Sequence, residues 1–350
     1  MKKTLLILLL STIGINAQTA TNYVTTGFNT PTGIAFDGTG NLFVADYYTY
    51  KITKVTSGLV QSNFATVNGT PQQIAFDASG NLWLAGSGLF QEIEKISPTG
   101  VVTTYAATGS PYGIAIDASG NVYYSESNSG NIKKRTTAGV TTTFASDFYQ
   151  PNGLAFDPSG NLLVADKLDG SVKKITPSGT ISTLISGMAN PTNLVVAPNG
   201  DLYISTGSQN RIFRFPAGGV DGDQEQFIRF NVDYDTPAQM AIYNGALYVT
   251  TGSSTKKVIK ITSPSLGLGD IKNNKNEGIA IYPNPATDYL HIESNNDITI
   301  ETIDLYDMSG RVVKNFNPSE VQENTIPVSN ISSGNYILKV NTTSKKIIVK

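Results

Sequence analysis

Cysteine is absent from the 350-residue sequence, and histidine occurs only once, at His291. The first absence excludes disulfides and thiolate metal sites, and it leaves the redox compartment undetermined. The second removes the commonest general base and the commonest transition-metal ligand from everything before His291. Charge is also scarce, because 15% of residues are charged and the net charge is −2. No basic field would attract nucleic acid, so we expect no nucleic-acid partner.

The N-terminus has the order of a secretory signal peptide. Lys2 and Lys3 precede an apolar run from Leu5 to about Ile15, and the small-residue ending "INA" follows. This run is shorter than the roughly 20 apolar residues that a membrane helix needs. We expect residues 1–17 to be cleaved after Ala17 and the mature chain to have no membrane span. The alternatives are a buried N-terminal strand or an anchor helix.

Six related segments follow one another along the chain, and each begins at a proline. The spacings between successive starts are 40, 40, 40, 40 and 46 residues. The segments are "PTGIAFDGTGNLFVAD" at Pro31, "PQQIAFDASGNLWLAG" at Pro71, "PYGIAIDASGNVYYSE" at Pro111, "PNGLAFDPSGNLLVAD" at Pro151, "PTNLVVAPNGDLYIST" at Pro191 and "PAQMAIYNGALYVTT" at Pro237. A period of this length indicates a repeat architecture.

A repeat typically predicts four short strands, with the first two joined by a turn of the type "DxSGN", which the sixth repeat shortens to "YNGA". Asp bonds the backbone two residues on, and Gly takes the positive φ that closes a hairpin. Four strands in about 40 residues are typical of a propeller blade. The sixth repeat supplies only three strands, and residues 22–28 predict the missing fourth. We therefore expect an all-β fold, with a six-bladed β-propeller from about residue 19 to residue 263 whose last blade is closed by the N-terminal strand.

The shared string "PxGIAFDxxGNLxVAD" resembles NHL-type and SMP-30/gluconolactonase-like propeller repeats over most of the mature chain. The repeats are also similar to those of streptogramin B lyases, which depend on a catalytic histidine. Because no histidine precedes His291, that activity is disfavoured. The resemblance indicates the fold, which does not by itself specify a reaction.

Residues 264–278 are rich in Asn, Lys and Gly and read as a linker. Residues 279–350 predict about seven short strands in a small β-sandwich. The strings "YPNPATDYL", "LYDMSGR" and "ISSGNYILKV" resemble the C-terminal sorting domain of the type IX secretion system of Bacteroidota. The resemblance implies that the secretion machinery is a partner and that the protein is secreted or held on the outer cell surface. The alternative is a carbohydrate-binding or immunoglobulin-like accessory domain.

Strand alternation sorts the polar residues of the repeats onto two faces of the ring. Asp37, Asp77, Asp117 and Asp157 lie on the face of the "DxSGN" turns and recur in register, which favours a turn-forming role. A basic residue recurs in the third strand of each repeat, and we expect it to cover apolar edges or pair with carboxylates. The opposite face differs from blade to blade, as a face that recognises an asymmetric ligand should. Its ligand-binding candidates are Gln72, Tyr112, Asn152, Asn193, Tyr48 and Tyr149.

Oxygen ligands for Ca²⁺ or Mg²⁺ are also available on this variable face. The candidates are Asp46, Glu126, Asn152, Asp166 and Asn193. The resemblance to gluconolactonases implies a metal-binding Asn in "PNGLAF", which is Asn152, although Thr32 stands where that family has an acidic ligand. In the alternative interpretation, Asp46 and Asp166 belong to the repeat consensus and bond loops.

Three functions remain open from the sequence. The leading one is an exported, monomeric binding module that holds a small molecule, glycan or protein on the variable face without catalysis. The alternative is a divalent-metal-dependent lactonase or hydrolase, with Ca²⁺ or Mg²⁺ as cofactor. A third is adhesion or surface scaffolding.

Overall fold

The computed structural model describes residues 18–87, 91–107, 109–230, 236–252, 255–263, 266, 279–282, 286–294, 300–307, 312–317, 325–341 and 343–349. The expected signal peptide and most of the expected linker lie outside these residues. The chain divides into two compact units, residues 1–269 and residues 270–350. In the part of the chain that the structure describes, no helix has the length and apolar character that a bilayer crossing requires.

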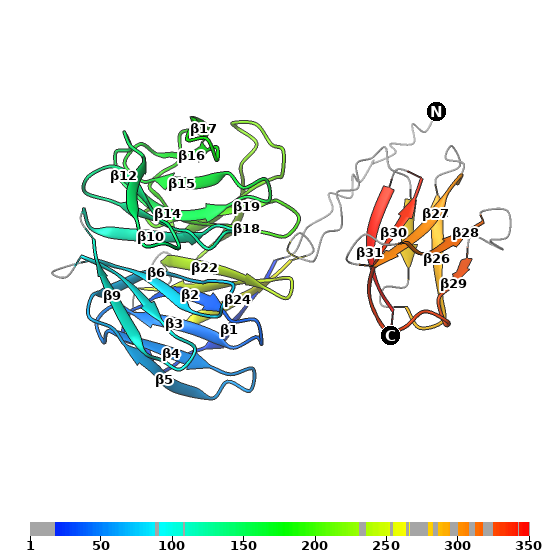
Figure 1. Ribbon diagram of the computed structural model, residues 1–350, viewed down its shortest axis with the longest axis horizontal. Coiled ribbons are helices and arrows are strands. Elements are labelled where there is room, and N and C mark those ends of the chain that lie inside the picture. The colour runs from blue at the N-terminus through cyan, green and yellow to red at the C-terminus, as the bar shows by residue number, and fades with distance from the viewer. Residues whose placement is uncertain are drawn as a thin grey trace, which may run out of the picture. The chain divides into compact units, whose positions relative to one another are not determined.

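Six four-stranded antiparallel sheets form the first unit, which confirms the expected six-bladed propeller (Figure 1). Blade one consists of β2 (Pro31–Phe36), β3 (Leu42–Asp46), β4 (Lys51–Val55) and β5 (Gln61–Thr66). Blade two consists of β6 (Thr70–Phe76), β7 (Leu82–Ser87), β8 (Glu92–Ile96) and β9 (Val102–Ala106). Blade three consists of β10 (Pro111–Ile116), β11 (Val122–Glu126), β12 (Asn131–Arg135) and β13 (Thr141–Ala145). Blade four consists of β14 (Pro151–Phe156), β15 (Leu162–Asp166), β16 (Ser171–Ile175) and β17 (Ile181–Ile185). Blade five consists of β18 (Pro191–Val196), β19 (Leu202–Thr206), β20 (Arg211–Phe215) and β21 (Glu225–Arg229). Blade six consists of β22 (Pro237–Tyr243), β23 (Ala246–Thr251), β24 (Val258–Thr262) and β1 (Thr19–Val24).

The first strand of every repeat is the innermost strand of its blade. Figure 1 shows β2, β3, β4 and β5 following one another outward. The inner strands β2, β6, β10, β14, β18 and β22 each contact the next, and β22 contacts β2, so the ring is closed. Glycine permits this close approach. A Cβ at Gly33 would lie 2.4 Å from the carbonyl oxygen of Gln72, and one at Gly113 would lie 2.1 Å from that of Asn152.

Blade six takes its outer strand from the N-terminal end of the described chain. β1 pairs antiparallel with β24, and Thr19 lies opposite Thr262. The strand covers residues 19–24 rather than the expected 22–28. It ends at Val24 because the chain bends before Pro31, where Gly27 has a φ of 95°.

The hairpin turns have the chemistry that their sequence predicts. In the first repeat, Asp37 Oδ1 accepts hydrogen bonds from the backbone N–H groups of Thr39 and Asn41, both at 2.9 Å. The same bonds recur at Asp77, Asp117 and Asp157. In the sixth repeat, Asn244 and Gly245 have φ values of 46° and 68°, as a two-residue Asn-Gly turn requires.

The recurring basic residues of the third strands lie over aromatic rings of the second strands. Cation–ring contacts of this kind are worth about 0.5–1 kcal/mol at exposed sites. The pairs are Lys54 over Phe43, Lys95 over Trp83, Lys134 over Tyr123 and Lys260 over Tyr248, at 5.1 to 5.8 Å from the ring centroids. In blade five, Arg214 instead pairs with Asp201 and Glu225. The expected structural role of this column is confirmed for these five residues.

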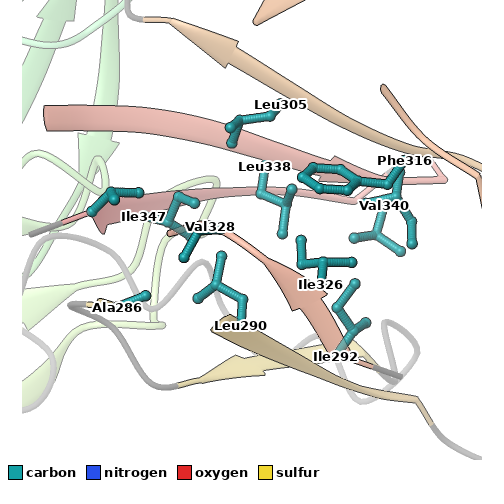
Figure 2. Close-up of a cluster of buried hydrophobic side chains, with 12 residues drawn as sticks. Ala286, Leu290, Ile292, Leu305, Phe316, Ile326, Val328, Leu338, Val340 and Ile347 are labelled. Atoms are coloured by element: carbon teal, nitrogen blue, oxygen red, sulfur yellow. The ribbon is translucent and has the colours of Figure 1, made fainter. Parts of the chain in front are cut away.

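The second unit is a small β-sandwich, as expected. One sheet has the order β25 (Ile279–Tyr282), β26 (Tyr289–Ser294), β29 (Thr325–Pro327), and the other β28 (Val312–Phe316), β27 (Ile303–Asp307), β30 (Gly334–Val340), β31 (Thr343–Val349). Figure 2 shows side chains of both sheets meeting in one apolar core, with Leu290 and Ile292 on one side and Leu305 and Leu338 on the other. His291 is half-buried on the opposite face of β26, with Nδ1 3.2 Å from Thr325 Oγ1.

A charge buried under β1 is expected to open the ring at blade six. Val24 is buried against blade six and blade one, so Val24→Asp would place an unpaired carboxylate in an apolar cluster and lower the free energy of unfolding by about 2 kcal/mol or more. Thr21→Asp adds the same charge at an exposed position of β1 and serves as the control. Urea denaturation measures both, and equal stabilities for the two variants would contradict closure by β1.

Candidate functional site

The mouth of the ring is lined by the two residues that follow each repeat proline. In each blade the register between the inner strand and the second strand shifts between the repeat proline and the next buried apolar residue. This irregularity is a β-bulge, and a bulge changes the direction of the side chains beside it. The first position reads Thr32, Gln72, Tyr112, Asn152, Thr192 and Ala238. The second reads Gly33, Gln73, Gly113, Gly153, Asn193 and Gln239. None of these residues is charged.

Hydroxyl groups bind neighbouring blades together at this level. Ser125 Oγ donates to the carbonyl oxygen of Asn152 at 2.7 Å, and Thr250 Oγ1 donates to that of Thr32 at the same distance. Thr32 Oγ1 in turn donates to the carbonyl oxygen of Pro71 at 2.8 Å. All three bonds cross from one blade to the next, so Thr32 is part of the ring closure.

Two amide side chains at the second position cross between blades. Gln73 Oε1 accepts from the N–H groups of Ile114 and Leu154, and Gln73 Nε2 donates to the Leu154 carbonyl oxygen at 3.0 Å. Gln73 thus joins blade two to blades three and four. Asn193 Oδ1 accepts from the Met240 N–H at 3.0 Å and joins blade five to blade six. The sequence signal for both is their position, where the repeat consensus has glycine.

Tyr112 and Gln239 meet across the ring, from blades three and six. Burial raises the pKa of the Tyr112 phenol, and Tyr47 adds to this effect, while a hydrogen bond from Gln239 opposes it. The phenol therefore stays neutral over the physiological range. Tyr47, Tyr112 and Gln239 come from three separate blades, so they converge over the mouth of the ring.

Three amide atoms at the mouth are buried and have no hydrogen-bond partner among the described residues. They are Asn152 Oδ1, Asn193 Nδ2 and Gln239 Oε1. They lie on the neighbouring inner strands β14, β18 and β22, and Asn193 Nδ2 lies 3.0 Å from the place of a Cβ at Gly153. Buried polar groups are almost always paired with protein or water, so each unpaired atom requires an explanation. Together they offer one donor and two acceptors to a molecule at the mouth.

The remaining ligand-face candidates lie around this mouth. Gln72 is buried, and its Nε2 donates to Ser87 Oγ at 2.8 Å. Tyr48 and Tyr149 are 64% and 72% exposed. Tyr48 packs edge-on against Tyr47, with their ring centroids 5.0 Å apart.

The carboxylates considered as metal ligands are each engaged within their own blade. Asp46 accepts from the N–H groups of Thr30 and Thr49, which flank it in two loops. Asp166 accepts from the Gln150 N–H at 2.8 Å and pairs with Lys173 at 3.0 Å. Among the described residues, no group of three or more Asp, Glu or His side chains is placed to hold a metal ion.

Glu126, the third of these carboxylates, has the same kind of environment. It is buried, and its Oε2 accepts from Ser129 Oγ at 2.8 Å. Lys133 Nζ lies 3.8 Å from the same oxygen. Asp46, Glu126 and Asp166 therefore support loops and third strands. Of the proposed metal-ligand set, Asn152 and Asn193 each retain a buried side-chain atom that has no hydrogen-bond partner among the described residues.

Blade two carries a buried carboxylate that the sequence analysis missed. Glu94 occupies the position in β8 that Lys133 and Lys173 hold in the next two blades, and it is fully buried. Its Oε1 accepts from the Asn68 N–H at 3.1 Å and from Thr104, whereas Oε2 has no partner among the described residues. Burial raises the pKa of Glu94 by more than these hydrogen bonds lower it, and the Glu92 charge raises it further.

Comparison with known proteins gives a family for the second unit and a fold for the first. Residues 280–350 match the family of secretion system C-terminal sorting domains. No curated protein matches the chain by sequence. A streptogramin B lyase structure is 15% identical with a TM-score of 0.57, covering 70% of this chain and 98% of that one.

Two further solved structures give the same result. A gluconolactonase from Xanthomonas campestris is 15% identical with a TM-score of 0.59, covering 70% of this chain and 89% of that one. A catalytically inactive virginiamycin B lyase from Staphylococcus aureus, solved with quinupristin, is 14% identical with a TM-score of 0.56, covering 70% and 99%. The first unit is thus a six-bladed propeller like those of streptogramin B lyases and gluconolactonases. The second unit is a secretion system C-terminal sorting domain.

Removing the Asp166 carboxylate is expected to destabilise the propeller. Asp166→Ala leaves Lys173 with a weaker partner and frees the Tyr149 and Gln150 N–H groups, so the free energy of unfolding should fall by about 3 kcal/mol. Asp169→Ala removes the more exposed partner of the same lysine and should cost less than about 1 kcal/mol. Urea denaturation compares the two variants, and a harmless Asp166→Ala would show that this carboxylate is not structural.

Glu94 predicts a defined pH dependence of stability. Its folded-state pKa is higher than the unfolded value of about 4.5, so its contribution is fully present below that pH and is lost as pH rises through the folded pKa. Glu94→Gln should therefore raise the Tm at pH 8 and match the unsubstituted chain near pH 4. The exposed Glu225 gives the control, because Glu225→Gln should show no gain at pH 8. If the Tm of Glu94→Gln and that of the unsubstituted chain changed in parallel with pH, ionisation of buried Glu94 would not be the cause of the lost stability.

Proposed function

We propose that the propeller is an exported binding module that holds a neutral, polar small molecule at the mouth of the ring and does not transform it. The observation that carries this proposal is the set of three unpaired buried amide atoms on β14, β18 and β22. A ligand with hydroxyl or amide groups would complete their hydrogen bonds.

The composition of the mouth supports an uncharged ligand. The twelve lining positions hold amides, hydroxyls, glycines, one alanine and one phenol, and they hold no ionised group. The phenol of Tyr112 remains neutral because partial burial raises its pKa. Nearby, the exposed rings of Tyr48 and Tyr149 offer flat apolar surfaces on which a sugar or peptide could rest.

The environment of the carboxylates favours binding over catalysis. Asp46, Glu126 and Asp166 are held by loop N–H groups, hydroxyls and lysines. Any of these carboxylates would have to lose its present hydrogen bonds before it could act as a general acid or base at the mouth. The lactonase alternative requires a divalent ion on Asn152 and Asn193 together with a carboxylate released from these bonds.

The sorting domain supports export through the type IX secretion system. Its presence at residues 280–350 indicates the secretion machinery as a partner and a secreted or cell-surface protein. With the signal peptide expected at residues 1–17, we propose that the chain first crosses the inner membrane and then the outer membrane. The propeller is the part that acts outside the cell.

The binding proposal is tested by thermal shift of the full chain against neutral sugars, lactones and short peptides, in EDTA and in CaCl₂. At least one neutral compound should raise the Tm in EDTA, since a ligand that binds only the folded state stabilises it. Asn152→Leu should abolish this shift and preserve the starting Tm, because it removes Oδ1, a buried polar atom with no partner among the described residues.

Asn63→Leu makes the same change on the exposed surface of β5 and should leave the shift intact. A shift that needs Ca²⁺, accompanied by lactone hydrolysis, would replace the binding proposal with the lactonase. No shift with any compound would remove the mouth of the ring as a binding site.

A further inference from the structure

A cavity lies on the face of the propeller opposite the mouth of the ring, between blades two and three. Its volume is about 380 Å³, within the range of about 300–1,000 Å³ that is usual for small-molecule sites. It is lined by the "DxSGN" turns of both blades, by Trp83, Lys95 and Tyr105 of blade two, and by Arg135 of blade three. The turn residues of this face are similar in blades one to four, so residues that depart from the repeat distinguish this interface from its neighbours.

Arg135 departs from the repeat. It ends β12 opposite Val122. In the other five blades, the residue at this register is apolar and buried, namely Val55, Ile96, Ile175, Phe215 and Ile261. A guanidinium has therefore replaced a core side chain at one interface of six. Packing of the blades alone does not require that change, because five blades form without it.

The sixth residue of each repeat, counted from its proline, also bears on this cavity. It is Phe in blades one, two and four, and it is aliphatic in blades three, five and six, namely Ile116, Val196 and Ile242. In blades two and four, the first strand ends in Phe76 or Phe156, whose ring packs edge-on against an aromatic ring of the preceding blade, at 5.0 and 5.2 Å between centroids. In blade three that place is taken by Ile116, which is smaller and packs beside Trp83 and Tyr105. The missing ring leaves room at the interface between blades two and three.

Two cationic groups flank a pair of stacked aromatic rings along the wall of the cavity. Lys95 Nζ lies 5.4 Å from the centroid of the Trp83 ring, which stacks on the Tyr105 ring at 5.7 Å. The Arg135 guanidinium covers Tyr105 at 4.2 Å. This arrangement holds the guanidinium over the Tyr105 ring, and a guanidinium can donate two N–H groups to one planar carboxylate.

Both cations are free to meet a ligand. Within the described residues, neither Lys95 nor Arg135 forms an ion pair with a carboxylate, and Arg135 Nη1 donates to the backbone oxygen of Gly139 at 2.7 Å. Asp77 also lines the cavity, but Trp83 Nε1, Asn81 Nδ2 and the N–H groups of its own turn already donate to it. The rim adds the hydroxyls of Ser79, Ser119 and Thr137.

From this arrangement we infer that the cavity between blades two and three binds an acidic saccharide, with the carboxylate on Arg135 and the sugar hydroxyls on the serine and threonine rim. The site is independent of the mouth of the ring, since it lies on the other face and uses different residues.

Isothermal titration calorimetry of the full chain with sodium glucuronate tests the inference, with glucose and inorganic phosphate as comparison probes. Glucuronate should bind, and glucose and phosphate should each bind at least about tenfold more weakly. Glucose lacks the carboxylate that Arg135 would hold, and phosphate lacks the sugar hydroxyls. Arg135→Ile restores the residue of blades two and four at this position. It should weaken glucuronate binding by about tenfold or more while leaving the Tm unchanged or higher.

Lys134→Gln is the matched control, because it removes the same charge one residue away, where Lys134 lies over Tyr123 outside the cavity. Its glucuronate affinity should equal that of the unsubstituted chain. Arg135→Lys keeps the charge but loses the paired donors and should fall between the two. Should Arg135→Ile unfold the chain, Arg135→Lys and Lys95→Gln carry the test. The inference is overturned by absent glucuronate binding, by equal binding of glucose or phosphate, or by undiminished binding in the folded Arg135 variants.

Discussion

Backbone contact between neighbouring inner strands is the constraint on which the propeller depends. At Gly33 and Gly113 the next strand lies so close that a Cβ would meet its carbonyl oxygen. Hydroxyls such as Ser125 and Thr250 then bond directly from one blade to the next. The amides of Gln73, Asn193 and Gln239 replace glycine where the spacing between inner strands allows a side chain.

The polar residues of the variable face divide into those that the ring uses and those that it leaves open. Asp46, Glu126 and Asp166 belong to the first kind, since loops and lysines occupy their oxygens. Asn152, Asn193 and Gln239 belong to the second, since each keeps one unpaired atom. These unpaired atoms lie at the mouth of the ring, whereas Lys95 and Arg135 line the cavity between blades two and three.

The fold could be predicted from the sequence because its signals are local and periodic. Prolines 40 to 46 residues apart, a glycine-containing turn in each repeat and a missing fourth strand in the last one were sufficient to define six blades. The candidate site was less accessible, because its contacts join distant residues. Nothing in the letters shows that Gln73 bonds Leu154, 81 positions away, or that Asp166 is held by Lys173. Arg135, by contrast, could have been found by aligning the third strands, where it alone is charged at an apolar position.

The pairing of β1 with β24 places both ends of the propeller side by side in one sheet. The order in which the blades are connected is therefore separable from the order in which they pack. A circularly permuted chain, in which residue 263 is joined to residue 18 and new ends are made in an exposed hairpin, would retain every strand pair of the ring.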